Sequence, residues 1–161
     1  MIYSTSTEYA IRGLCELAGR SIESSSATVM LEQVVVGTTL PREFLSKLFQ
    51  QLVKGGILTS AKGRHGGFAL ARPTHQITLF HIVAAIDGND ACDRCVVGLD
   101  ACTDAMHCPQ HDLFKPIRHR IRDYLQTTTL ADMIACLRSK PGWPNLPHLA
   151  SDPTDTPAPG S

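Results

Sequence analysis

Hydrophobic residues recur at helical spacing along much of this chain, and each such stretch predicts a helix. In STEYAIRGLCELAGR (residues 6–20), Tyr9, Leu14 and Leu17 fall on one face, which predicts an amphipathic helix. Ser6 or Thr7 is the expected N-cap, because a side-chain oxygen there can accept a hydrogen bond from a backbone N–H of the first turn.

Two shorter helices are predicted next, close to one another. VMLEQVVVGTT (29–39) is apolar and is expected to end at Gly37. LPREFLSKLFQQLVKGG (40–56) is expected to begin at Pro41 and to stop at Gly55 and Gly56, because proline favours a first turn and glycine follows a last one. The inner stripe of this helix is expected to comprise Phe44, Leu45, Leu48, Leu52 and Val53.

The pattern then changes to short extended segments before it returns to helices. ILTSAKG (57–63) and GGFALAR (66–72) flank a glycine-rich tip and predict a β-hairpin. ITLFHIVAAIDG (77–88) predicts a helix between Thr78 and Gly88, and helical spacing resumes in 113–140, where Thr129 is the expected cap of a final short helix. The predicted fold is mainly α with a small β-hairpin wing, in the order of a winged helix-turn-helix.

Charge is distributed unevenly although the formal net charge is zero. Residues 40–72 carry six basic side chains and one acidic one, whereas residues 80–114 carry six aspartates and one arginine. The 161 residues suit one compact domain. The N-terminus lacks the pattern of a signal peptide and no apolar run reaches the ~20 residues of a membrane span, so we expect a cytoplasmic protein without a membrane partner.

The helix predicted at 40–56 carries an outer face suited to DNA. An α-helix fits the major groove, where Lys and Arg bind phosphates or guanine edges and Gln pairs with adenine. The glycine-rich hairpin tip is suited to phosphate or minor-groove contacts. A solvated amphipathic face, or a winged helix that binds protein, is the alternative interpretation. The candidate DNA-binding residues are Arg42, Glu43, Ser46, Lys47 and Gln50 from the helix, and Lys62, Arg64 and His65 from the tip.

A cysteine-rich stretch, CDRCVVGLDACTDAMHCPQH (92–111), follows the fourth predicted helix. Its spacing is C-x2-C-x6-C-x5-C-x2-H. Cytosolic thiols stay reduced, which disfavours a disulfide framework. Thiolates bind zinc and iron-sulfur clusters, and the long gaps suit the larger cluster, whereas zinc sites more often pair two close-spaced knuckles. An iron-sulfur cluster is therefore the first hypothesis and zinc the second. Cys15 and Cys136 lie on apolar helix stripes and are expected to be buried.

Five segments, in order along the chain, carry a resemblance to a known family. They are STEYAIRGL, PREFLSKLFQQLVKGGILTSAKGRHGGFALAR, ITLFHIVAAIDG, CTDAMHCPQH and TTTLADMI. Together they resemble the successive signatures of the IscR/NsrR-type family, also called the Rrf-two family, of bacterial winged-helix regulators. The resemblance covers residues 1–138 and leaves the proline-rich end outside.

The resemblance implies a homodimeric transcription factor, expected to act as a repressor. Such proteins bind palindromic double-stranded DNA operators, and many carry a [2Fe–2S] or [4Fe–4S] cluster whose state tunes DNA affinity. The implied organisation is a winged helix-turn-helix domain at 1–88, a cluster-binding loop at 89–112, dimerisation helices at 113–138 and a disordered tail at 139–161. The long C-terminal dimerisation helix would run from Phe114 to Thr127.

The resemblance also implies the ligands. Cys102 and Cys108 match the family pattern C-x5-C-x2-H, and Cys95 stands seven residues before Cys102, one more than in that pattern. Cys92 is therefore an alternative ligand beside Cys95.

Two further residues compete for the fourth ligand position. His111 ends the family pattern, and its alternative role is that of a capping or surface residue. Glu8 matches the place where some members supply a carboxylate from the partner subunit, and its alternative role is a charge that interacts with the helix dipole.

The pattern does not favour an enzyme, because the cysteines crowd one loop and no Gly-rich phosphate cradle is present. The alternative function is a zinc-stabilised winged-helix protein that binds DNA or a protein partner without sensing redox state.

Overall fold

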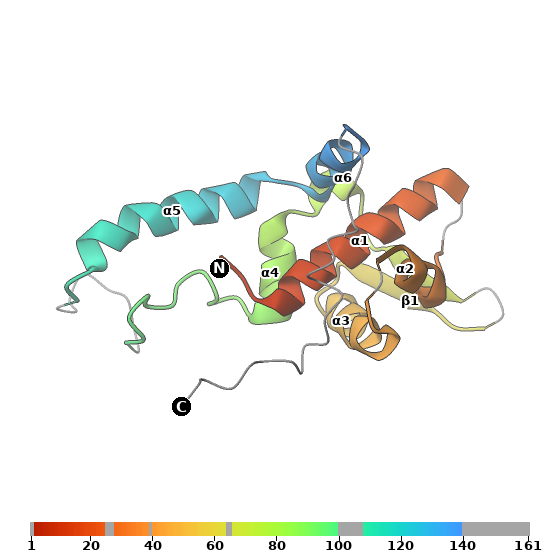
Figure 1. Cartoon of the computed structure of the whole chain (residues 1–161), viewed down its shortest axis with the longest axis horizontal. Helices are drawn as coiled ribbons and strands as arrows, with labels where there is room; N and C mark the ends of the chain where they lie inside the picture. The colour runs from red at the N-terminus through yellow and green to blue at the C-terminus, as the bar shows by residue number, and fades with distance from the viewer. Residues whose placement is uncertain (1, 25–27, 39, 64–65, 100–107, 140–161) are drawn as a thin grey trace, which may run out of the picture.

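Helices dominate the computed structural model, which describes residues 2–24, 28–38, 40–63, 66–99 and 108–139. Most elements pack into a head around α1, and α5 extends from this head as an arm (Figure 1). The mainly helical fold with one antiparallel hairpin is confirmed. The elements are α1 (Thr5–Ser24), α2 (Leu31–Thr38), α3 (Arg42–Lys54), β1 (Leu58–Ala61), β2 (Gly67–Leu70), the 3-10 turn η1 (Thr74–Gln76), α4 (Leu79–Asp87), α5 (His111–Thr127) and α6 (Leu130–Ser139).

Helix α1 begins earlier than its sequence predicts. Ser4 is the N-cap, and its Oγ accepts a hydrogen bond from the Thr7 N–H at 3.2 Å, so the prediction of Ser6 or Thr7 was wrong. Thr7 is instead fully buried. Ser4 holds this position because its backbone N–H donates to Asp87 Oδ2 at 2.9 Å and its hydroxyl donates to the same carboxylate. The start of α1 is therefore fixed by the end of α4.

Helix α2 runs through Gly37 to Thr38, so the prediction that Gly37 ends it was wrong. A methyl group on Gly37 would overlap the side chain of Glu16, which shows that glycine serves the close approach of α2 to α1. The end of α2 is held by a buried cation, because Arg12 Nη2 donates to the Thr38 carbonyl at 3.3 Å.

The buried stripe of α3 differs from the predicted one in three of its members. Leu45, Leu48 and Leu52 are buried as predicted, whereas the predicted Phe44 and Val53 are only partly buried. Phe49, which the prediction omitted, is fully buried. The stripe packs tightly on α1, and the Phe49 ring makes an edge contact with Phe68 of β2 at 5.1 Å between centroids.

The predicted hairpin is confirmed, and it is attached to the segment before α2. Strands β1 and β2 pair from Leu58 opposite Leu70 to Ala61 opposite Gly67. Val29 and Phe68 exchange two backbone hydrogen bonds, each 2.9 Å long. The hairpin is thus joined both to α3, through aromatic packing, and to the residue that precedes α2.

The caps of α4 and α6 agree with their predictions. Thr78 Oγ1 accepts from the His81 N–H at 3.3 Å, and His81 Nδ1 accepts from the Thr78 N–H at 3.0 Å. Thr129 Oγ1 accepts from the Asp132 N–H at 3.2 Å. These are reciprocal capping boxes. Helix α4 ends at Gly88, as predicted.

The long helix α5 begins at His111, three residues before the predicted Phe114. Its end at Thr127 agrees with the prediction and is joined to the start of α4, where the Leu79 N–H donates to the Thr128 carbonyl at 2.9 Å. The expected disordered tail lies outside the described residues except for Ser139, the last residue of α6. No helix in the described ranges is long and apolar enough to cross a bilayer.

We predict that Phe49→Ala lowers the free energy of unfolding by about 3–5 kcal/mol, because it removes a fully buried ring and leaves a cavity. Denaturant titration followed by circular dichroism measures this change. The matched control is Gln50→Ala, an exposed neighbour on the same helix, which should change stability by no more than about 0.5 kcal/mol. Equal losses in both variants would contradict the assignment of Phe49 to the core.

Candidate DNA interface and cysteine segment

A groove of about 430 Å³ lies between the start of α3, the start of α2 and the hairpin. Arg42 and Ser46 line it from α3, and they face Ser60 and Gly63 from the hairpin. Two of the residues proposed for DNA contact therefore share one groove with the wing. The full lining comprises Met30, Leu31, Glu32, Arg42, Ser46, Ser60, Ala61, Gly63, Gly66, Gly67 and Phe68.

The other DNA candidates on α3 lie on its outer surface. Glu43, Lys47 and Gln50 are exposed, and Ser46 is half-buried. Lys62, just after β1, is exposed as well. Arg64 and His65 lie outside the described residues. The structure thus leaves the polar face of α3 open to solvent beside the hairpin.

Arg42 is paired within the protein. Its Nε and Nη2 donate to Glu32 Oε1 of α2 at 3.0 and 2.8 Å. A hydrogen bond at its own backbone and the bond from Arg42 lower the pKa of the Glu32 carboxyl. Both side chains are about 60% exposed, so the ion pair contributes little to stability. Arg42 can therefore exchange Glu32 for a phosphate at small cost.

The buried Arg12 is a residue that the sequence analysis missed. It is 5% exposed and its guanidinium carbon lies 6.0 Å from the centre of the Tyr9 ring. Burial lowers the pKa of Arg12. Its bond to Thr38 joins α1 to the end of α2, immediately before the turn that leads to α3. The only sequence signal for this role is its place three residues after Tyr9 on the apolar side of α1.

The described cysteines of the segment differ in their environments. Cys92 belongs to the hydrophobic core with 9% exposure, whereas Cys95 and Cys108 are half-buried. Burial raises the pKa of the Cys92 thiol, and the nearby positive charge of Arg122 opposes this effect. Cys102 lies outside the described residues.

The remaining candidate ligands come from helices. His111 is the first residue of α5, as its alternative role requires, but it is 6% exposed and is therefore not a surface residue. Its N–H donates to the Cys108 carbonyl at 3.1 Å. Glu8 is half-buried on α1. Among the described residues, no three His, Cys, Asp or Glu side chains form a metal site, but the soft thiol donors of the segment are the type that iron-sulfur clusters need.

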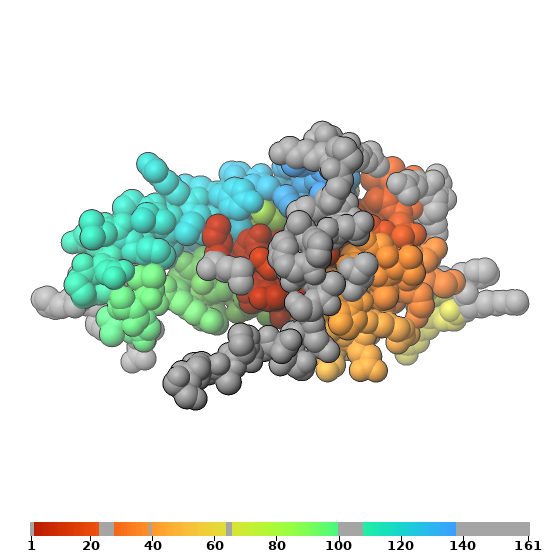
Figure 2. Space-filling model, viewed as in Figure 1, coloured from red at the N-terminus to blue at the C-terminus, as the bar shows by residue number. Residues whose placement is uncertain are grey.

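Asp93, beside Cys92, ties the segment to α5. Its carboxylate accepts hydrogen bonds from Arg122 Nη2, and its carbonyl accepts one from Arg118 Nη1 at 3.5 Å. Figure 2 shows the residues after α4 lying against the start of α5. The described residues of the segment before residue 100 therefore run along the arm rather than away from it.

The two cysteines outside the segment have opposite surroundings. Cys15 is 5% exposed in the core, as predicted, and burial raises the pKa of its thiol to about 12. Cys136 is exposed, so the expectation of burial was wrong. The buried residues Leu130 and Ile134 form the apolar face of α6, and Cys136 lies outside that face.

Comparison with known proteins gives one consistent result. Residues 3–136 match the family described as "Rrf2: Iron-dependent Transcriptional regulator". A helix-turn-helix-type transcriptional regulator of Aquifex aeolicus is 29% identical over 136 residues, which cover 83% of this chain and 92% of that protein. The transcriptional regulator IscR of Pectobacterium carotovorum is 26% identical, with 78% and 74% covered. The structure of CymR, the global cysteine regulator of B. subtilis, matches with a TM-score of 0.66 at 22% identity, over 83% of this chain and 95% of that one.

We predict that Cys15 resists alkylation by iodoacetamide at pH 8 at least about tenfold longer than Cys108, because only about one part in ten thousand of a thiol with a pKa near 12 is ionised there. Mass spectrometry of metal-free, reduced protein measures both rates. In guanidinium chloride, where burial is lost, the two thiols should react alike. Equal rates in the folded protein would show that Cys15 is not held in the core.

Proposed function

Because the chain belongs to the Rrf2 family of transcriptional regulators, we propose that it is a dimeric DNA-binding repressor whose affinity for its operator is controlled by an iron-sulfur cluster. The observation that carries the DNA-binding part is the open polar face of α3 beside the hairpin groove. The observation that carries the sensing part is the attachment of the cysteine segment to α5 through Asp93.

DNA binding requires a helix that can enter the major groove and cations that can hold phosphates. Lys47 and Gln50 are exposed on α3, and they provide a cation for phosphate or guanine and an amide for adenine. Arg42 and Ser46 face the wing across the groove, so a DNA backbone that follows α3 would pass between helix and hairpin. Lys62, Arg64 and His65 are then the proposed wing contacts.

Dimerisation is proposed from the apolar surface that α5 leaves uncovered. Leu113, Ile117 and Tyr124 are 75%, 51% and 45% exposed. They are spaced four and seven residues apart, so they lie along one side of the helix. A contiguous apolar stripe of this kind marks an interface, and a second copy of α5 would cover it. Two copies would present two α3 helices to the half-sites of a palindrome.

The proposed cluster ligands are Cys95, Cys102 and Cys108. The structure favours Cys95 over Cys92 because Cys92 packs in the core beside Arg122. Residue 122 lies eleven positions along α5 from His111, a rise of about 16 Å, whereas Cys108 stands three residues before the helix. Cys95 is half-buried and is therefore more open to a cluster than the buried Cys92.

The fourth ligand is proposed to be His111 or Glu8 of the partner subunit. His111 follows Cys108 in one turn and is held by the backbone bond to it. When bound, a cluster supplies reversible redox chemistry and sensitivity to small oxidants. Reduced thiols of this kind are maintained in the cytoplasm, which is where we place the protein.

Coupling to DNA would pass through bonds that this chain makes itself. Asp93 connects the segment to Arg118 and Arg122 of α5, and the end of α5 is bonded to the start of α4 at Leu79. The end of α4 is bonded to Ser4, at the start of the helix against which α3 packs. A change in the segment can therefore alter the angle between α5 and the head, and with it the separation of the two α3 helices.

We predict that Lys47→Gln weakens binding to all duplexes and reduces the slope of log affinity against log salt by about one, because one phosphate contact is lost. Fluorescence anisotropy with duplex DNA at several salt concentrations measures this. The charge-matched control is Lys115→Gln in α5, the arm that extends from the head (Figure 1), and it should leave the slope unchanged. An unchanged slope for Lys47→Gln would remove α3 from the interface.

We predict that protein purified without oxygen contains iron and sulfide, and that Cys102→Ser with Cys108→Ser abolishes both. Operator affinity should differ between the two proteins by about 5–150-fold, the usual range of allosteric coupling. Elemental analysis, absorption spectra and anisotropy with an operator selected from random duplexes measure these quantities. Equal affinities would exclude control by the cluster, and zinc without sulfide would identify the zinc-stabilised alternative.

The route of coupling is tested in the same assay. Asp93→Asn should retain iron but shrink the difference in operator affinity between cluster-bound and cluster-free protein, because the bond to Arg122 is weakened. Asp90→Asn is the matched control, since Asp90 lies just before the segment and its ion pair is with Arg94. Equal behaviour of the two variants would rule out Asp93 as the connection.

A further inference from the structure

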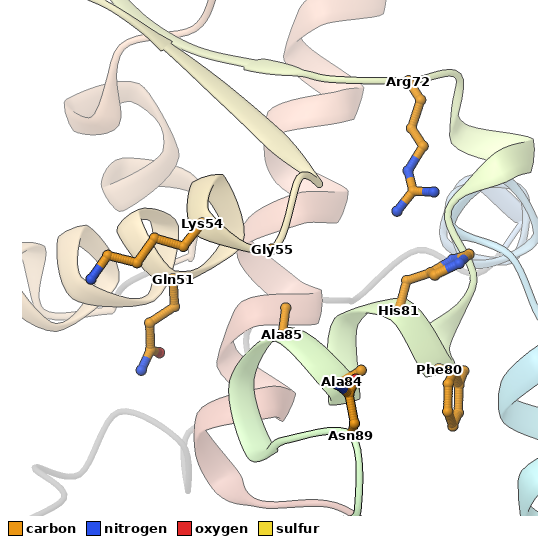
Figure 3. A pocket seen from close by; sticks show the side chains of 9 residues that line it. All are labelled: Gln51, Lys54, Gly55, Arg72, Phe80, His81, Ala84, Ala85 and Asn89. Carbon is orange, nitrogen blue, oxygen red and sulfur yellow. The ribbon is translucent and has the colours of Figure 1, made fainter.

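A second hollow, of about 460 Å³, lies at the end of α3 (Figure 3), whereas the hairpin groove lies at the start of that helix. It is formed where the end of α3, the segment after β2 and helix α4 meet. Its volume is in the range of small-molecule sites. None of the proposed cluster or DNA residues lines it. The lining comprises Gln51, Lys54, Gly55, Arg72, Phe80, His81, Ala84, Ala85 and Asn89.

The lining is rich in hydrogen-bond donors and contains no carboxylate. Arg72 and Lys54 are cations, and Gln51 and Asn89 are amides. In Figure 3 the Arg72 guanidinium points from the segment after β2 toward α4, whereas the Lys54 side chain extends along α3 away from Arg72. Of the two cations, Arg72 is therefore the one whose charge is directed toward α4.

Arg72 carries a donor without a partner. Its Nε is fully buried and has no hydrogen-bond acceptor among the described residues. Buried donors are nearly always satisfied by protein, by water or by a bound ion, so an orphan of this kind points to an occupant of the hollow. A guanidinium in particular matches the planar oxygen pairs of carboxylates and phosphates.

His81 provides a second, oriented donor. Its Nδ1 accepts the Thr78 N–H at 3.0 Å, so the neutral ring carries its proton on Nε2. Burial and then the positive charge of Arg72 lower the pKa of His81. The positive charge of Arg72 disfavours protonation of the His81 ring, and the same charge favours an anion bound beside that ring. Arg72 and His81 thus come from different elements and line the same hollow.

We propose that this hollow is an oxyanion-binding site, built on Arg72 and His81, for a small organic phosphate or carboxylate. The anionic group would accept from the Arg72 guanidinium, which points toward α4, and from His81 Nε2. Phe80, Ala84 and Ala85 form an apolar wall for the organic part of the ligand, and Gln51 and Asn89 supply further donors at the mouth. A phosphate of bound DNA has the same chemistry, and the experiment separates the two sources.

The position of the site makes it a second input to the regulator, distinct from the cysteine segment. An anion there would join the segment after β2 to α4. The Phe80 ring on its wall also lies 6.0 Å below the guanidinium carbon of Arg122, the residue that binds Asp93. The site uses none of the segment's thiols, so it stands whether or not a cluster is bound.

The test is a titration of the full chain with inorganic phosphate, with chloride as the reference at equal ionic strength. Nuclear magnetic resonance follows the Arg72 Nε–Hε signal and the imidazole of His81. Bound phosphate should shift the Arg72 signal saturably and raise the pKa of His81 by about one unit, because an anion favours the imidazolium. Arg72→Gln should abolish the effect on His81. The matched control, Lys115→Gln on α5, should respond as the native protein does.

A second variant, His81→Asp, tests the proposal independently in case Arg72→Gln disturbs the fold. His81→Asp retains Arg72 and a residue able to cap α4, but it places a carboxylate next to Arg72, so the Arg72 signal should no longer respond to phosphate. A response to duplex DNA but not to free phosphate identifies the DNA backbone as the source of the oxyanion. The proposal is overturned if neither phosphate nor duplex shifts the Arg72 signal, or if Arg72→Gln leaves the His81 response intact.

Discussion

Close packing of α3 against α1 is the constraint on which the rest of the structure depends. At Gly13 the helices approach so closely that a methyl group would lie 2.8 Å from Phe49 Cε1 and 2.9 Å from Leu45 Cδ1. This contact fixes which stripe of α3 faces inward, and it therefore fixes that Lys47 and Gln50 face outward. The Phe49 ring also meets Phe68 of the hairpin, so one packed layer sets the relation between the polar helix face and the wing.

Helix α4 connects this head to the arm. Its start is bonded to the residue that follows α5, and its end is bonded to Ser4 before α1. The cysteine segment leaves α4 with Cys92 packed in the core and Asp93 bound to α5. The exposed ion pairs contribute little free energy individually, but they determine where the segment runs. Burial of Cys92 holds the start of the segment in the core more firmly than these ion pairs do. Cys92 therefore has a structural role, whereas Cys95 and Cys108 are more accessible to a ligand.

Much of the fold was predictable, because a helix or strand that buries only one face shows this in the spacing of its own hydrophobic residues. The caps at Thr78 and Thr129 follow from residues within one turn of each other, and the hairpin follows from two short extended stretches that are neighbours in the sequence. The errors share another cause. Gly37 was taken as a stop although it allows α2 to approach α1, and Ser4 caps α1 because Asp87 from a distant helix holds it. The residues next to Gly37 and Ser4 in the sequence do not indicate that α1 packs on the first or that Asp87 binds the second.

The sequence by itself determined the order of elements, the polar face of α3 and the thiol-rich character of residues 92–111, because periodicity and donor chemistry are properties of short stretches. Only the tertiary structure decided which of those residues share a space. It placed Arg42 against Glu32, buried Cys92 and left Cys136 exposed. It also brought Arg72 and His81 from separate elements to one hollow and left a buried donor there without a partner among the described residues. The burial of a side chain and its bonding partner depend on residues that are distant in the sequence, and the spacing of hydrophobic residues within one helix does not identify them.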